Sequence, residues 1–185
     1  NLVGLRPSVP LVSRFGMMPA TPTVDTLGPM TRSVEDAAIL LDVLAGYDPN
    51  DPVSVYSVGH IPDTYQSFLD EAGLEGARIG VIRQPMGPRT DPESDDYKKV
   101  WAVMERAIDD IASLGAEIID PVEINGLELV DSIYGGNVFE TELAINDYLA
   151  GLPHAPVSSL EEILLTGKVT PWRAGRFANL MGRTA

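Results

Sequence analysis

The stretch Gly28–Tyr47, which reads GPMTRSVEDAAILLDVLAGY, combines a turn, a helix start, an apolar helical pattern and a helix stop. The pair Gly28-Pro29 predicts the turn. Ser33 is a favourable N-cap residue, and Asp36 lies three positions later, where the acid of a capping box is found. We therefore expect a helix that begins at Val34.

This predicted helix is apolar on nearly all sides. Its apolar residues recur at intervals of three and four, and only the positions near Glu35 and Asp42 are left for water. The pattern indicates a helix that is buried nearly all round. Gly46 stands where a left-handed C-terminal residue is expected, and the prolines of residues 48–52 cannot continue a helix.

The remainder of the chain indicates an α/β architecture. Residues 1–27 contain four prolines among apolar residues, which favours an irregular, half-buried lead-in. The run 77–82 predicts a buried parallel strand, residues 92–114 a helix and residues 117–119 the next strand. A strand, a helix and a strand in this order form a βαβ unit.

Two further helical regions are expected downstream. Residues 124–149 are mostly helical in pattern, with an interruption at Gly135-Gly136. Residues 159–165 predict a short helix that Gly167 stops.

Composition limits the classes of function. The 185 residues are 44% hydrophobic and 22% charged, which is typical of one globular domain or a piece of one. The net charge is −14, and the 13 basic residues are scattered singly, so neither nucleic acid nor a membrane surface is an expected direct partner. No window approaches the roughly twenty apolar residues of a membrane-spanning helix.

The residue types that bind metals or act as nucleophiles are sparse. Cysteine is absent, and His60 and His154 have no acid or second histidine at ligand spacing, so no metal site is expected. Lys98, Lys99 and Lys168 lie outside any serine- and glycine-rich segment, and no Gly-x-Ser-x-Gly motif presents a serine. The adjacent acids are typical of solvated helix faces. The 185 residues therefore contain no complete catalytic set.

Three motifs, in this order and spacing, resemble the amidase signature family: GLRPS at residues 4–8, VSRFG at residues 12–16 and VDTLGPMTRSVEDAA at residues 24–38. They resemble the part of the family that follows its glycine- and serine-rich signature. The run ARIGVIR and the segment from Phe139 to Ala150 are similar to later parts of the family in a looser way.

The resemblance implies a serine hydrolase of amide bonds. In that family a serine nucleophile is activated by a second serine, in a cis peptide, and by a lysine, while backbone amides stabilise the oxyanion without a metal or an organic cofactor. All three residues would lie upstream of Asn1, so no catalytic residue is assigned to this chain.

The implied fold is part of an α/β amidase domain, a mixed β-sheet core with helices on both faces, incomplete in this chain. We expect residues 1–51 to follow the nucleophile loop, residues 52–119 to contain a loop and the βαβ unit, and residues 120–185 to form a helical substrate-side region.

Four residues receive roles by their position in the family pattern. Tyr134 and Phe139 would form part of the wall of the acyl pocket, or alternatively belong to the core. Asp25 and Arg32 would support the nucleophile loop by hydrogen bonds without reacting themselves.

The expected partners are a small-molecule amide substrate and the missing N- and C-terminal parts of the same domain; a homodimer is left open. Residues 1–12 lack the pattern of a signal peptide, and the absent initiating methionine suggests upstream sequence. We expect a cytoplasmic protein. The alternatives are a glutamyl-tRNA amidotransferase A-like subunit and a non-catalytic scaffold or fragment.

Overall fold

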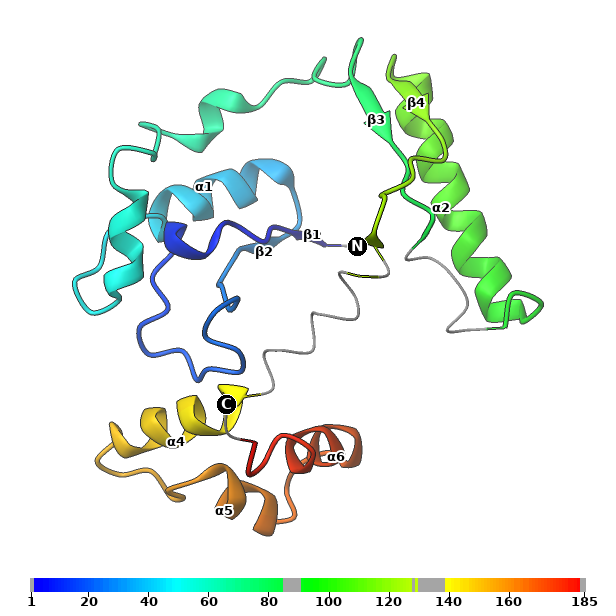
Figure 1. Cartoon of the computed structure of the whole chain (residues 1–185). Helices are drawn as coiled ribbons and strands as arrows, with labels where there is room; N and C mark the ends of the chain where they lie inside the picture. The colour runs from blue at the N-terminus through cyan, green and yellow to red at the C-terminus, as the bar shows by residue number, and fades with distance from the viewer. Residues whose placement is uncertain (1, 85–90, 128, 130–138, 184–185) are drawn as a thin grey trace. The chain divides into compact units, whose positions relative to one another are not determined.

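The computed structural model describes residues 2–84, 91–127, 129 and 139–183 (Figure 1). The chain forms two compact units. The first combines Asn1–Ser67 with Ser132–Ala185, and the second is Phe68–Asp131.

The first unit begins with a two-stranded antiparallel sheet. Strand β1 (Val3–Gly4) pairs with β2 (Met30–Thr31), and the amide of Leu5 donates to the carbonyl of Pro29 at 3.0 Å. Gly28 approaches β1 so closely that a Cβ atom on it would lie 1.9 Å from the carbonyl oxygen of Leu5. The turn before β2 therefore requires glycine.

Helix α1 (Val34–Leu44) begins where the sequence predicts. The hydroxyl of Ser33 accepts a hydrogen bond from the amide of Asp36 at 3.0 Å, which confirms the N-cap. Only one face is buried, through Ala37, Ala38 and Leu41, whereas Ile39 and Val43 are 42% and 77% exposed. In this chain the expectation of burial nearly all round is therefore wrong.

The predicted end of α1 is also corrected. Ala45 has an extended conformation, and Gly46 is not left-handed. Ala45 forms an antiparallel bridge with Val12, and the amide of Gly46 donates to the carbonyl of Leu11 at 3.1 Å. The helix ends because the chain turns into an extended pairing with an earlier segment, which needs no left-handed cap.

Short helical turns complete the N-terminal part of the chain: η1 (Val9–Leu11), η2 (Pro52–Ser57) and η3 (Tyr65–Phe68). The η1 turn packs against η2. The lead-in of residues 1–27 is thus largely irregular, as predicted, apart from β1 and η1.

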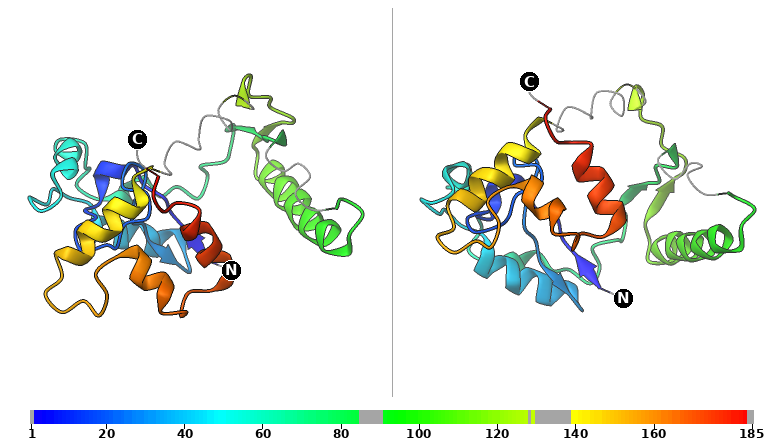
Figure 2. Two further views of the ribbon diagram at one scale, coloured as in Figure 1. Left: turned by 60° about the horizontal axis from the view of Figure 1, so that its bottom comes forward. Right: turned by 90° about the horizontal axis from the view of Figure 1, so that it is seen from below.

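Three helices form the C-terminal part of the first unit, α4 (Thr141–Ala150), α5 (Leu160–Leu165) and α6 (Pro171–Ala178), and they lie together in both views of Figure 2. Their core consists of Ile145, Leu149 and Leu160. The hydroxyl of Ser159 caps α5. Helix α5 confirms the prediction for residues 159–165, and α4 confirms the later part of the helical region predicted over residues 124–149. Residues 124–126 are not helical, and the Gly135-Gly136 interruption lies outside the described residues.

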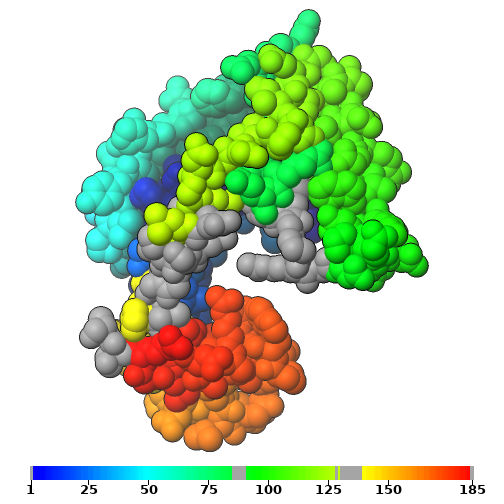
Figure 3. Space-filling model, turned by 45° about the vertical axis from the view of Figure 1, so that its right-hand side comes forward, coloured from blue at the N-terminus to red at the C-terminus, as the bar shows by residue number. Residues whose placement is uncertain are grey.

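The second unit contains the predicted βαβ arrangement, with the long helix α2 labelled in Figure 1 and the atoms of this part of the chain drawn in green in Figure 3. Strand β3 (Arg78–Gly80) pairs in parallel with β4 (Glu117–Ile119), and α2 (Asp95–Ser113) connects them. Arg83, just after β3, donates to Asp120 after β4 and to Glu105 on α2. These hydrogen bonds, first to Asp120 and then to Glu105, raise the pKa of Arg83.

The expected burial of β3 is not seen in this chain. Arg78 and Gly80 are exposed and Ile79 is half-buried, although Val81 directly after the strand is buried. Among the described helices, none is both long enough and apolar enough to cross a bilayer.

Candidate functional site

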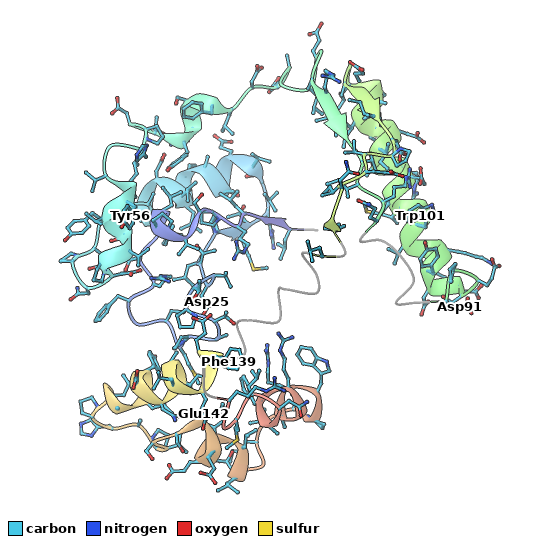
Figure 4. All side chains as sticks on the ribbon, in the orientation of Figure 1. Asp25, Tyr56, Asp91, Trp101, Phe139 and Glu142 are labelled. Atoms are coloured by element: carbon cyan, nitrogen blue, oxygen red, sulfur yellow. The ribbon has the colours of Figure 1, made fainter. Side chains whose placement is uncertain are left out.

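Asp25 lies in a loop of the first unit, next to the start of α4, where Figure 4 also labels Phe139. Its carboxylate accepts hydrogen bonds from the amides of Ala20 and Thr21, both at 2.7 Å. The amides of Val24 and Asp25 both donate hydrogen bonds to the carbonyl of Thr21, at 2.9 Å. The Asp25 side chain therefore closes its own loop, residues 20–25.

The other predicted site residues occupy different surroundings. Arg32 is exposed, and within the described ranges its side chain has no hydrogen bond or ion pair. Phe139 is 45% exposed and directly precedes the first turn of α4. Tyr134 lies outside the described residues. The support role of Arg32 and the pocket-wall role of Phe139 remain predictions.

An ion pair between Arg14 and Asp51 lies beside the 20–25 loop. The Arg14 Nη2 atom lies 2.9 Å from Asp51 Oδ1, while Nε and the backbone amide of Arg14 donate to Asp51 Oδ2 at 3.0 and 2.9 Å. Asp51 is only 7% exposed. The hydrogen bonds from Arg14 hold the pKa of Asp51 at about 2, and Asp51 in turn raises the pKa of Arg14.

The same arginine reaches the 20–25 loop. Its Nη1 atom donates to the carbonyl of Pro22 at 2.6 Å, and Arg6 donates to the carbonyl of Val24. Arg14 thus connects the 20–25 loop to Asp51, which lies 37 positions after Arg14 in the sequence. The sequence does not reveal this pair, because nothing local marks two residues at that separation as partners.

A second polar network lies beside the first. The Ser13 hydroxyl donates to Asp48 Oδ2 at 2.6 Å, which lowers the pKa of Asp48. The buried hydroxyl of Ser54 accepts from the Asp48 amide at 2.8 Å and contacts the carbonyl of Asp51 at 2.7 Å. The loop after α1 is therefore tied to the segment that carries Arg14.

The 20–25 loop also contacts the start of α4. The hydroxyl and the amide of Thr23 donate to Glu140 Oε2 at 2.6 and 3.2 Å. Nearby, the hydroxyl of Tyr148 donates to the carbonyl of Gly16 at 3.1 Å. Through these contacts the structure brings the predicted residues Asp25 and Phe139 into one region of the first unit.

A cavity of about 430 Å³ lies elsewhere in the same unit, and Asp25, Arg32 and Phe139 do not line it. Its lining residues come from η1, η2, their flanks and the start of η3: Ser8, Pro10, Leu11, Tyr56, Ser57, His60 and Tyr65.

The described residues offer structural support and no complete reacting set. They contain no cluster of histidines and acids that could hold a metal ion. All three lysines are exposed, and Lys98 and Lys99 pair with Glu93 and Asp96.

The two small sheets and their helices define an α/β protein. The family model described as Amidase matches residues 1–180. The chain belongs to the amidase family, which confirms the resemblance in its motifs.

Individual relatives agree with this assignment. The chain is 43% identical over 118 residues, 64% of its length, to the glutamyl-tRNA(Gln) amidotransferase A subunit of Acaryochloris marina, and 31% identical over 173 residues, 89% of its length, to a probable amidase of Arabidopsis thaliana. The solved peptide amidase of Stenotrophomonas maltophilia matches all of the chain at 28% identity, with a TM-score of 0.68. The fold is therefore part of an amidase-signature fold.

These matches cover only part of each relative. The chain spans 22% of the amidotransferase protein, 30% of the plant protein and 34% of the solved peptide amidase.

Proposed function

We propose that the protein containing this chain is an amidase that hydrolyses the C–N bond of a carboxamide to a carboxylate and ammonia or an amine. The observation that carries the proposal is the family match over residues 1–180. The similarity of the whole chain to a peptide amidase structure supports it further.

The proposed chemistry uses a serine, a second serine in a cis peptide and a lysine, all upstream of this chain. The serine oxygen attacks the amide carbonyl, and its proton passes through the second serine to the neutral lysine and then to the leaving nitrogen. Water hydrolyses the resulting ester, which returns the serine and releases the carboxylate. Backbone amides stabilise the oxyanion in both steps.

In this proposal the present chain supports the nucleophile loop and forms part of the substrate pocket. The 20–25 loop, closed by Asp25 and held by Arg14, supports the nucleophile loop, together with Arg32. Phe139 contributes to the acyl-pocket wall, and so does Tyr134. The remaining parts of the same domain cover the apolar faces that this chain exposes.

A component of a tRNA-dependent amidotransferase is the second candidate, because the amidotransferase of Acaryochloris marina has 43% identity. That alignment includes 64% of the chain, whereas the plant amidase aligns with 89% and the peptide amidase structure with all of it. The net charge of −14 also disfavours direct contact with tRNA. We therefore favour the stand-alone amidase over this candidate and over a non-catalytic scaffold.

The test uses the complete protein with acetamide, benzamide and an amino-acid amide as substrates. We expect release of ammonia, which replacement of the upstream nucleophile serine by alanine abolishes. Ammonia transfer to Glu-tRNA in the presence of glutamine, without turnover of simple amides, would favour the amidotransferase. No turnover in either assay would favour the scaffold.

A further inference from the structure

Thr23 and Glu140 connect two segments of the first unit that are 117 positions apart in sequence. Both donors of Thr23, its hydroxyl and its amide, converge on the same carboxylate oxygen, Glu140 Oε2. A hydrogen bond to an ionised acceptor is about twice as strong as one between neutral groups. This pair of contacts therefore defines how the 20–25 loop meets the start of α4.

The position of Thr23 is fixed by hydrogen bonds of its own loop that do not involve Glu140. Asp25 binds the amides of Ala20 and Thr21, and Arg14 binds the carbonyl of Pro22 on the residue before Thr23. Arg14 is itself paired with the buried Asp51. The hydroxyl and the amide of Thr23 therefore cannot shift far if Glu140 moves.

The Glu140 side is equally constrained. Glu140 is the N-cap residue of α4, and the next residue, Thr141, is buried. Further along α4, Ile145 and Leu149 pack into the core with Leu160. Phe139 directly precedes Glu140, so a hydrogen bond to the Glu140 carboxylate restrains the backbone from which the Phe139 ring extends.

We propose that Glu140 is a positioning residue that, through Thr23, sets the place of Phe139 and thereby determines which acyl groups the enzyme accepts. The inference rests on the proposed amidase function and on the pocket-wall role that the proposal gives to Phe139. It assigns no chemical step to Glu140, which acts on the substrate only through its neighbour. Loss of the contact should therefore weaken the binding of substrates with large acyl groups and leave small ones nearly unchanged.

The chain offers a matched control directly after the same loop. Thr26 has the same side chain three positions later, but among the residues that the structure describes its hydroxyl reaches only the carbonyl of the adjacent Leu27, at 3.4 Å. Replacement by valine removes the hydroxyl of either threonine at nearly constant volume. Glu140→Gln keeps an acceptor oxygen for Thr23 but removes the charge, so it should fall between wild type and Glu140→Ala.

The experiment measures kcat and KM of the complete protein for benzamide and for acetamide. We expect Thr23→Val and Glu140→Ala each to raise KM for benzamide about tenfold, equivalent to about 1.4 kcal/mol, with kcat changed less than about twofold. For acetamide, and for Thr26→Val with either substrate, KM should change by less than about twofold. The double variant Thr23→Val/Glu140→Ala should be no worse than either single variant, because both remove the same contact.

Three results would overturn the inference: additive effects of the two substitutions, an equal loss with both substrates, or an equal loss in Thr26→Val. If Glu140→Ala does not fold, Thr23→Ser and Thr23→Val replace it, since serine keeps the hydroxyl and should retain the selectivity that valine loses. If kcat and KM are the same in all these variants as in the unmodified protein, the inference is refuted and the proposed function is not. Absence of turnover in the unmodified protein refutes the proposed function, and this inference with it.

Discussion

At the scale of single residues, Asp51 makes the closest buried contact between charges in the described part of the first unit, to Arg14 at 2.9 Å. Because its pKa falls from 3.8 to about 2 in the folded chain, the ionised form is bound more tightly there than in the unfolded chain. The contribution to stability is complete above about pH 4. It is lost as the pH falls from about 4 through about 2, where the folded carboxylate also takes up a proton.

We predict that Asp51→Asn lowers the free energy of unfolding by about 2 kcal/mol at pH 7, the value that corresponds to this pKa difference. The variant should also lose less stability than wild type between pH 4 and pH 2. Urea unfolding at a series of pH values measures both. Asp63→Asn, at an exposed position, is the control and should follow the wild-type curve; identical acid curves for wild type and Asp51→Asn would contradict the assignment.

Two glycines of the same region should respond in opposite ways to alanine. A Cβ at Gly28 would lie 1.9 Å from a backbone oxygen and 2.8 Å from the Pro7 ring, whereas one at Gly46 would have no atom within 4 Å. We predict that Gly28→Ala costs about 3 kcal/mol or more, while Gly46→Ala is neutral or stabilises by up to about 1 kcal/mol. Thermal unfolding of the two variants decides this, and a harmless Gly28→Ala would show that β1 does not pass as closely as described.

At the scale of secondary-structure elements, the N-cap of α1 can be tested directly. Ser33→Ala removes the acceptor for the Asp36 amide and should cost about 1 kcal/mol, whereas Ser33→Gly should cost only a few tenths. Ser33→Asn restores an acceptor and should recover most of the loss. Chemical denaturation of the three variants gives the comparison, and equal losses in all of them would exclude capping as the cause.

The elements also show which structural features a sequence can predict. The starts of α1 and α5 were predictable because a serine cap and its helix lie within four residues of each other. The βαβ order of the second unit was predictable from the apolar periodicity of its segments. The end of α1 was not, because the bridge from Ala45 to Val12 depends on residues 33 positions away that no local pattern links.

The candidate site was less predictable than the fold. Asp25 and Phe139 entered only through the family resemblance, and their proximity depends on the contact of Thr23 with Glu140. The pairing of Arg14 with Asp51 left no signal in a single sequence, since each residue is an ordinary surface type until the fold buries them together.

At the scale of the whole molecule, the exposed face of α1 conflicts with its composition. A helix that is apolar all round is normally buried all round, yet Val43 is 77% exposed in a chain that spans 22% to 34% of the three relatives compared above. In the proposed amidase, other parts of the same domain cover such faces. If so, a polar side chain at residue 43 would have to be buried in the complete protein.

We therefore predict that Val43→Gln lowers the free energy of unfolding of the complete protein by about 2 kcal/mol, because an amide is desolvated where a methyl-rich side chain packed before. Glu35→Gln introduces the same side chain on the same helix, at a position where the sequence predicts contact with water, and should change stability by less than about 0.5 kcal/mol. Denaturant unfolding of both variants, followed by a probe in this unit, measures the difference. An equally small effect of the two substitutions would mean that water reaches Val43 in the complete protein. This face of α1 would then not be covered by other parts of the domain.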